Sequence, residues 1–339
     1  MFLVIDGSSI LSSCYYGTLP IAYSKAKTEE ERTEAAKQIL HTSSGVYTNG
    51  IYGSLNIILN ILKDHPEISH LAIVFDKTRN TFRRQISKEY KANRKPTPNL
   101  LSMQFHHLMS ICDTIGIPTL VSDTFEADDL AGSIIARFHE NQPMVFLTKD
   151  HDYLQMIDDN VTGWILTNSQ KQADAIMNRD NLPAEKRNLP AKTALFQSST
   201  VYQEECVYPF QIPDKKGLCG DSSDNIPGVA GIGPTTALPL LQDFYTIENI
   251  YQAIDTYAYP LENLQKEWQQ KYKITKARFQ KLVDGKADAL MSKQLATIAV
   301  NAPVPHKLNS YQRNIDKTQL QQVLSHYEMP SLAHFVNEL

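Results

Sequence analysis

Three short apolar runs most constrain what this 339-residue chain can fold into. FLVI (2–5), LAIVF (71–75) and MVFL (144–147) are brief, rich in β-forming residues and separated by sequence with helical character. This pattern is typical of strands buried in a parallel α/β sheet. IPTLV (117–121) and GWIL (163–166) are candidates for two more strands. We therefore predict an α/β fold with a mostly parallel central sheet flanked by helices.

After residue 167 the sequence changes from alternating apolar runs and helical stretches to polar sequence without a clear period. We expect an α/β core over 1–167, a polar, irregular connection over 168–216, a smaller all-helical domain over 217–300 and a C-terminal tail over 301–339. The stretch 20–48 reads as a solvated insertion in the core. The expected helices lie at 28–40, 50–64, 99–115, 128–140 and 318–327.

The cysteines and the N-terminal sequence indicate in which cellular compartment the protein is expected. The four cysteines are scattered, with no C-x-x-C pair and no metal-ligand spacing, as is usual in a reducing compartment. The start, MFLVIDGSS, lacks a basic segment and meets an acid at position 6, which argues against a signal peptide. The apolar stretches are too short to span a bilayer. We expect a cytoplasmic monomer with no membrane partner.

Acidic residues follow the predicted strands. Asp6, Asp76 and the pair Asp150 and Asp152 come at or just after the ends of the three strongest strands. Because the carboxyl ends of parallel strands meet at one edge of a sheet, we expect these side chains around one crevice. Two more groups, one opening the helix after residue 125 and one in the stretch GDSSD, extend the set. The nine candidate metal ligands are Asp6, Asp76, Glu126, Asp128, Asp129, Asp150, Asp152, Asp221 and Asp224.

A single aspartate is more often a helix cap or a turn residue than a metal ligand. Gathered carboxylates, however, raise one another's pKa and destabilise the fold unless a cation neutralises them. Oxygen ligands without a Cys or His set favour Mg²⁺ or Mn²⁺ over Zn²⁺. Two such ions about 4 Å apart are the arrangement that stabilises the attacking and leaving oxygens in phosphoryl transfer.

The stretch GDSSDNIPGVAGIGPTTA (220–237) combines two of these acids with a glycine-rich turn. Asp221 and Asp224 are three residues apart, so they would share one face of a helical turn. The glycines then lead into a helix start, whose backbone N–H groups can bind a phosphate. We expect the acids to hold metal while the turn holds a phosphate of the same polymer.

Positive charge is concentrated in KTRNTFRRQISKEYKANRK (77–95). This segment has eight lysines and arginines against one acid, in a chain whose net charge is −4. A charge run is often a solvated face, but this one interleaves Phe82 and Tyr90, which suit stacking on bases. It also leaves directly from Asp76. A basic segment beside an acidic metal site suits a nuclease better than a phosphatase of small substrates.

Eight motifs occur in the order found in a known family. The chain resembles the 5′-nucleases, which include flap endonucleases, phage 5′-exonucleases and the N-terminal nuclease domain of bacterial DNA polymerase I, in their stand-alone bacterial form. The resemblance covers roughly residues 1–300. The motifs are VIDGSS (4–9), YGSLNIIL (52–59), IVFDKTRNTFR (73–83), EYKANR (89–94), EADD (126–129), TKDHDYLQM (148–156), GDSSDNIPGVAGIG (220–233) and QLATI (294–298).

The resemblance implies roles for the acidic and basic residues. All nine acids are expected to be ligands of two Mg²⁺ or Mn²⁺ ions per site. Residues 77–105 are expected to form a basic helical arch, through or beside which a single-stranded 5′ end passes. Lys91 and Arg94 become catalytic residues that stabilise charge on the scissile phosphate, and Tyr90 becomes a base-stacking residue.

The resemblance also makes 217–300 a helix–turn–helix-like domain that grips duplex DNA, with a K⁺ ion on loop carbonyls of the 228–233 turn. The usual Lys of GIGPKTA is Thr235 here, which removes one phosphate contact. The expected DNA contacts are Phe82, Arg83, Arg84, Tyr90, Lys95, Gly228, Gly231, Ile232, Gly233 and Thr235.

These residues favour a metal-dependent 5′-3′ exonuclease and flap endonuclease that acts on DNA with a 5′ end, flap or nick, or on an RNA–DNA hybrid, in replication or repair. Two alternatives stay open. One is a ribonuclease of the related single-domain fold with a similar acidic pocket, and the other is a non-catalytic DNA-junction binder. The sequence leaves open whether flap cleavage, exonuclease action or RNA-primer removal dominates.

Overall fold

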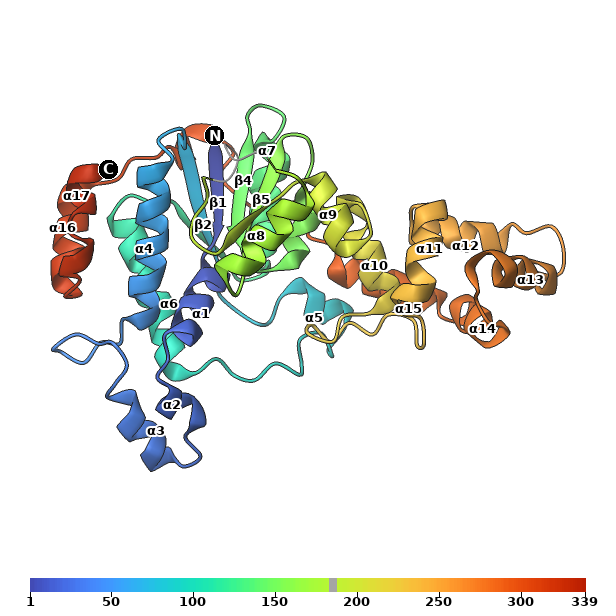
Figure 1. Ribbon diagram of the computed structural model, residues 1–339, viewed down its shortest axis with the longest axis horizontal. Helices are drawn as coiled ribbons and strands as arrows, with labels where there is room; N and C mark the ends of the chain where they lie inside the picture. The colour runs from blue at the N-terminus through green and yellow to red at the C-terminus, as the bar shows by residue number, and fades with distance from the viewer. Residues whose placement is uncertain (183–187) are drawn as a thin grey trace.

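The computed structural model describes residues 1–182 and 188–339, and its centre is one six-stranded sheet with the order β3-β2-β1-β4-β5-β6 (Figure 1). All neighbours are parallel except β5 and β6. The strands are β1 (Phe2–Asp6), β2 (His70–Asp76), β3 (Thr119–Ser122), β4 (Met144–Thr148), β5 (Val161–Leu166) and β6 (Thr193–Phe196). The five predicted strands are confirmed, and β6 is an additional edge strand.

The three strongest apolar runs form the centre of the sheet. Ile5 of β1 is in register with Ile73 of β2 and with Leu147 of β4. All five residues of β1 are buried, because helices cover a parallel sheet on both faces and leave no side for water. The strand order reverses between β1 and β4, and ligands of such sheets bind at the carboxyl ends beside this switch point.

Helices predicted between the strands are confirmed. The helices α1 (Gly7–Gly17), α4 (Asn49–Asp64) and α6 (Asn99–Thr114) contact one another, and α7 (Ala127–Phe138) packs on β1, β2 and β3. In α4, Ile51, Leu55, Ile58 and Leu62 lie three to four residues apart and are buried. This spacing places them on one face, which explains why the helix forms against the core.

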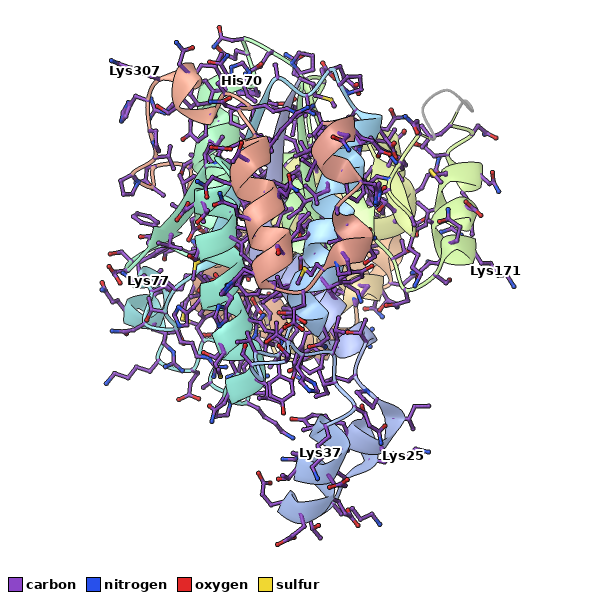
Figure 2. All side chains as sticks on the ribbon, turned by 90° about the vertical axis from the view of Figure 1, so that its left-hand side faces the viewer. Lys25, Lys37, His70, Lys77, Lys171 and Lys307 are labelled. Atoms are coloured by element: carbon purple, nitrogen blue, oxygen red, sulfur yellow. The ribbon has the colours of Figure 1, made fainter. Side chains whose placement is uncertain are left out.

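The expected insertion projects from the core beside α1 (Figure 1), and Lys25 and Lys37 mark it in Figure 2. It carries two short, mostly exposed helices, α2 (Ile21–Lys25) and α3 (Glu29–Ala36). A capping box on Thr28 and Glu31 begins α3. Near the end of the insertion, the backbone N–H of Ser43 donates to Glu328 of the C-terminal region at 2.9 Å.

The C-terminal residues pack on the core as a further layer (Figure 2). The helix α16 (Lys317–His326) contacts α6, and α17 (Phe335–Glu338) contacts α4. Arg313 donates to the carbonyl of Leu62 at 2.8 Å, which fixes the chain before these helices. Short 3₁₀ turns, η4 (Leu308–Tyr311) and η5 (Pro330–Leu332), complete this region.

The expectation that 168–216 is an irregular connection is wrong for its described residues. They form α8 (Gln170–Arg179), β6, α9 (Ser198–Glu205), η3 (Pro209–Gln211) and the start of α10, while 183–187 lie outside the described residues. Ala173, Ile176 and Met177 are the buried side of α8 in an otherwise polar helix. Four-residue β6 is too short to show a period and is stabilised by pairing with β5.

The predicted all-helical region is confirmed. It contains α10 (Ile212–Cys219), α11 (Pro234–Phe244), α12 (Ile247–Asp255), α13 (Leu261–Tyr272), α14 (Lys276–Asp284) and α15 (Lys286–Ala296). The helices α10 and α15 lie against each other (Figure 1), with Gly217 at the close approach. None of the helices in the described part of the chain is long and apolar enough to cross a membrane.

The basic segment is helical only in part. Its one helix before α6 is α5 (Phe82–Ile86), and residues 87–98 form turns and extended chain that run from α5 to α6 (Figure 1). Pro96 and Pro98 disfavour a helix here, because proline lacks the N–H donor and restricts the residue before it. The expected helical arch is therefore largely a non-helical strap, defined here as residues 87–98.

Candidate functional site

Asp6 ends β1 at the switch point and also begins α1. Its Oδ1 accepts a hydrogen bond from the Ser9 N–H at 2.9 Å, and its Oδ2 accepts one from Thr148 Oγ1 of β4 at 2.7 Å. The side chain is only 5% exposed. Burial, followed by the charge of Asp76, raises the pKa of Asp6 to about 7. A carboxylate this costly to ionise is one that a nearby cation would stabilise.

Asp76 ends β2 and joins the strand to α7. Its Oδ1 accepts from the N–H of Ala127 at 2.9 Å, and its own N–H donates to Ser8 Oγ at 2.8 Å. Unlike Asp6, it is exposed. The N–H groups at the start of a helix attract an acceptor, so the α7 terminus holds this carboxylate in place.

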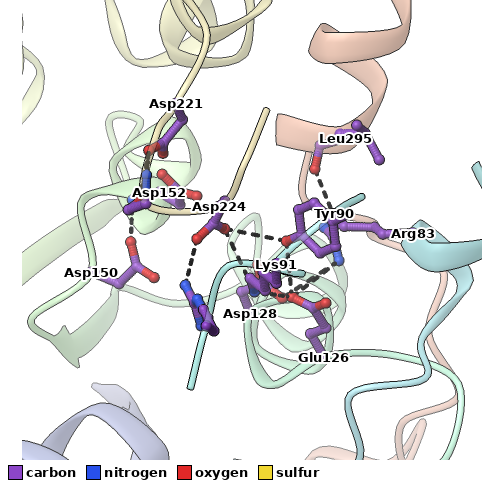
Figure 3. Close-up of polar contacts among 12 residues, drawn as sticks. Arg83, Tyr90, Lys91, Glu126, Asp128, Asp150, Asp152, Asp221, Asp224 and Leu295 are labelled. Carbon is purple, nitrogen blue, oxygen red and sulfur yellow. Dashed lines mark hydrogen bonds and ion pairs between the residues drawn. The ribbon is translucent and has the colours of Figure 1, made fainter. Parts of the chain in front are cut away.

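Glu126 and Asp128 open α7 as the sequence predicted. Glu126 accepts from Thr81 Oγ1 at 2.9 Å and pairs with Lys91 Nζ at 2.5 Å (Figure 3). Burial opposes its ionisation, but Lys91 and Arg83 hold the pKa of Glu126 below its usual range. Burial raises the pKa of Asp128 well above its usual range, despite the Arg83 charge.

Asp129 and Arg83 form a buried pair, and this changes the role expected of each. The guanidinium of Arg83 makes two 2.7 Å bonds to Asp129 and also donates to the carbonyls of Leu295 and Thr297. Arg83 is 1% exposed and Asp129 is fully buried. The prediction that Arg83 contacts DNA is therefore wrong, because its N–H donors already bind Asp129 of α7 and backbone carbonyls at the end of α15. Asp129 joins α7 to α5 through Arg83.

The side chain of Lys216 lies between Asp152, in the 3₁₀ turn η1 (His151–Met156) after β4, and Asp221 of the 221–226 turn. Its Nζ contacts Asp152 and lies 2.6 Å from Asp221 Oδ2. Burial and the charge of Asp150 raise the pKa of Asp152 to about 6. Burial opposes ionisation of Asp221, but hydrogen bonds from Lys216 and Ser223 lower the pKa of Asp221 to about 2.

Asp224 is buried beneath the strap. Arg94 contacts its Oδ1, and Lys91 Nζ lies 3.6 Å from its Oδ2 (Figure 3). Asp221 and Asp224 belong to a turn closed by paired backbone bonds between Asp221 and Ile226 at 2.8 Å. Tyr90 is 2% exposed, and its hydroxyl lies 3.2 Å from Glu126 and 3.3 Å from Asp224. A buried ring offers no face to a base, so the predicted stacking role of Tyr90 is not supported by this conformation.

The charges of four acids from different elements converge on one buried hydroxyl. Burial, and then the charges of Asp6, Asp128, Asp76 and Asp150, raise the pKa of Tyr153 well above its usual range. The Tyr153 hydroxyl has no hydrogen-bond partner among the described residues. The pairing of β1 with β2 and the hydrogen bonds of Asp6 with Thr148 and of Asp76 with Ala127 hold the carboxyl ends of β1, β2 and β4 and the start of α7 together.

Lysine and arginine side chains neutralise much of this acidic cluster as it stands. Within the described residues, no three acids, histidines or cysteines are arranged to hold one metal ion directly. Lys91, Arg94 and Lys216 instead contact Glu126, Asp224, Asp152 and Asp221. An all-oxygen donor set that gathers cations, and whose buried Asp6 is costly to ionise alone, fits a hard divalent cation such as Mg²⁺ or Mn²⁺.

The glycine turn leads into α11 as predicted. Gly228 has a φ of +62° and donates its N–H to Ser292 Oγ at 3.0 Å, and a Cβ there would meet the Gly220 nitrogen at 2.2 Å. Gly233 begins α11 without a side-chain cap. Gly231 and Thr235 are exposed, whereas Gly228 and Ile232 are buried. Only the exposed residues and the α11 terminus can therefore meet a phosphate directly.

The other expected DNA contacts vary in exposure. Lys95 is exposed. Arg84 is half-buried and donates to the carbonyl of Tyr90 at 3.3 Å, and the half-buried ring of Phe82 packs on Phe125 with centroids 5.6 Å apart.

Several residues that position the acids were not predicted from the sequence. Lys216 contacts two acids, and Ser8, Thr81 and Thr148 each bond an acidic residue of the cluster. Ser8 and Thr148 stand two residues from a predicted ligand, which is the signal that could have identified them. The sequence holds no such signal for Thr81, because it lies 45 residues from its partner Glu126.

Comparisons with known proteins identify relatives over nearly the whole chain. The family models "5′-3′ exonuclease, N-terminal resolvase-like domain" and "5′-3′ exonuclease, C-terminal SAM fold" match residues 1–185 and 207–319. The 5′-3′ exonuclease of Buchnera aphidicola subsp. Acyrthosiphon pisum is 32% identical over 90% of this chain and 89% of that protein. DNA polymerase I of Caldicellulosiruptor bescii is 33% identical over 97% of this chain, which spans only 33% of that protein.

Solved structures share the fold at low sequence identity. The T5 5′-exonuclease with bound zinc superposes with a TM-score of 0.58 and 18% identity, covering 99% of both chains. The catalytic core of Rad2 with DNA substrate gives a TM-score of 0.56 and 13% identity, covering all of this chain and 92% of that one. The structural matches support the fold. The family models and the Buchnera relative show to which family the chain belongs. The chain belongs to the 5′-3′ exonuclease family.

Proposed function

We propose that this chain is a divalent-metal-dependent 5′-3′ exonuclease and flap endonuclease that hydrolyses DNA phosphodiester bonds during replication or repair. The observation that carries this proposal is the set of carboxylates at the carboxyl end of the sheet, beside its switch point and beneath a basic strap. They come from the ends of β1 and β2, the turn after β4 and the start of α7, and Lys91 and Lys216 link Glu126 and Asp152 to the acids of the 221–226 turn. The family membership supports it, since the Buchnera relative is itself named a 5′-3′ exonuclease.

The proposed metals are two Mg²⁺ or Mn²⁺ ions held by the acidic cluster. Bound there, they would lower the pKa of an attacking water and stabilise the leaving oxygen. A structural neighbour, the T5 5′-exonuclease, is described with divalent metal ions bound, which supports a metal in this fold. Asp129 is assigned a supporting role because Arg83 occupies both of its oxygens. The proposed ligands are Asp6, Asp76, Glu126, Asp128, Asp150, Asp152, Asp221 and Asp224.

Lys91 and Arg94 are the proposed catalytic residues. Both lie at the acidic cluster, where their charges can offset negative charge that develops on a phosphate. Burial opposes their ionisation, but the charges of Glu126 and Asp224, respectively, hold the pKa values of Lys91 and Arg94 above their usual range, so both remain charged at neutral pH.

We name the all-helical region over 217–300 the helical unit and propose that it binds duplex DNA. The N-terminus of α11, with exposed Gly231 and Thr235 beside it, offers N–H groups to a backbone phosphate. A K⁺ ion on carbonyls of the 228–233 turn would strengthen that contact. The Rad2 core and a T5 flap endonuclease variant are described in complex with DNA, which supports a DNA partner for this fold. The presence of this unit also argues against the single-domain ribonuclease alternative.

A direct test uses a 5′-labelled DNA flap and a matched nicked duplex, each with Mg²⁺ or with EDTA. We expect metal-dependent cuts near the flap base or mononucleotides released at the nick, with Asp128→Asn inactive on both but still able to bind. The exposed Asp123→Asn substitution serves as a control because Asp123 pairs with Lys77 at the surface and is not one of the proposed ligands. Tight binding without cleavage by the wild-type protein would favour the junction-binder alternative.

A further inference from the structure

The strap is fastened to the turn that carries two of the proposed metal ligands. Three hydrogen bonds to backbone carbonyls join them: the Lys91 N–H to the Asp224 carbonyl at 2.8 Å, Asn93 Nδ2 to the Ser222 carbonyl at 2.8 Å, and Asn225 Nδ2 to the Glu89 carbonyl at 2.7 Å. The contacts run in both directions, since each segment donates an amide side chain to the backbone of the other. We name this pairing of residues 89–94 with 222–225 the clasp.

Apolar packing supports the clasp at its base. Tyr90 is buried in a small cluster with Ile226, Leu295 and Ala296, separate from the main core. Its hydroxyl lies within hydrogen-bond distance of both Glu126 and Asp224 (Figure 3). One side chain of the strap therefore touches acids from both α7 and the helical unit.

The backbone of the clasp is held in a costly conformation. Lys91 has a φ of +53° and Asn225 a φ of +55°. Asparagine adopts the left-handed region more readily than other non-glycine residues, but a lysine rarely does so without surrounding contacts that maintain it. The contacts of the clasp therefore maintain this conformation, and the clasp can open when they are lost.

The charged contacts of the clasp compete with the proposed metal. Lys91 Nζ lies 2.5 Å from Glu126 and 3.6 Å from Asp224, and Arg94 also contacts Asp224. A cation bound by these two carboxylates would take the place of the Lys91 and Arg94 charges. The same two side chains would be needed at the substrate phosphate, so they cannot serve both positions at once.

We propose that the clasp holds the strap closed over the acidic cluster in the metal-free protein, and that a divalent cation exchanges for Lys91 and Arg94 and opens it. Opening frees these two cations for a phosphate, so the strap is released only when the site is loaded. Asn93 and Asn225 are positioning residues of this device, because they contact backbone and no acid of the cluster. The inference rests on the proposed function for the identity of the cation.

Hydrogen–deuterium exchange of a peptide spanning 87–95 tests the clasp without using activity as its readout. In EDTA, the wild-type peptide should exchange slowly, and Mg²⁺ alone should accelerate it. Asn93→Ala combined with Asn225→Gly removes both amide side chains while glycine retains the positive φ at position 225. One neutral hydrogen bond shifts an equilibrium by about fivefold, so opening in the double variant should rise about 25-fold in EDTA.

The control is Asn80→Ala, an exposed amide in the same basic segment that should leave the slow exchange intact. Peptides of β1 and β4 report whether each variant is folded. Equal exchange of the wild-type peptide in EDTA and Mg²⁺, or slower exchange in Mg²⁺, would overturn the clasp. The two proposals fail separately: metal-dependent cleavage with metal-insensitive exchange rejects only the clasp, and metal-sensitive exchange without cleavage of flap or nick rejects only the nuclease.

Discussion

Asp6→Asn should stabilise the metal-free protein at neutral and alkaline pH. Asp6 is 5% exposed, and burial with the neighbouring Asp76 charge raises its pKa from an ordinary 3.8 to about 7. Each pKa unit is worth about 1.4 kcal/mol, so ionising Asp6 in the folded state costs about 4 kcal/mol. Asparagine keeps the acceptor for the Ser9 N–H but cannot ionise.

The sign follows from proton binding. The folded protein holds the Asp6 proton more tightly than the unfolded chain, so this group's contribution to stability falls as pH rises from about 4 to 7. Above pH 7 the loss is complete. The variant should therefore match the wild type near pH 4 and exceed its free energy of unfolding by about 4 kcal/mol at pH 8.

Urea unfolding in EDTA at several pH values between 4 and 8 measures this difference. Mg²⁺ should restore most of the wild-type stability at pH 8 and give the variant a smaller gain, because a bound cation neutralises the carboxylate. Asp123→Asn, at an exposed pair with Lys77, should show no such pH dependence. A wild-type-to-variant difference that stays constant from pH 4 to 8 would refute the reasoning.

Three further substitutions test the site and its supports. Lys91→Ala should slow a single turnover far more than it weakens DNA binding, and equal losses would reduce Lys91 to a phosphate anchor. Arg83→Met should lower the free energy of unfolding by about 3–5 kcal/mol, because Asp129 would remain buried and unpaired; a urea midpoint close to wild type would contradict that. Gly228→Ala should weaken duplex binding and lower the melting temperature, since its Cβ would meet Gly220; unchanged binding and melting would exclude the turn as the grip.

The extent of prediction differs between elements for physical reasons. Strands β1, β2 and β4 were predictable because burial on both faces makes them continuous apolar runs bounded by polar residues. Strand β6 was not, because four residues at a sheet edge are specified by pairing with β5 rather than by a local pattern. The strap was expected to be helical from its resemblance, whereas its prolines and its contacts with 222–225 hold it as turns.

The hydrophobic pattern was enough to predict five of the six strands, the helices between them and the acids at the strand ends, since the positions of strand termini follow directly from that pattern. The use of each charge follows from the packing of segments that are distant in the sequence. Arg83 and Lys91 belong to one basic run, yet one is buried on Asp129 and the other lies over Glu126 and Asp224. Their partners are at least 35 residues away in the chain, and pairings at that distance arise from packing. Local sequence carries the identity of a charge, and the fold determines its partner.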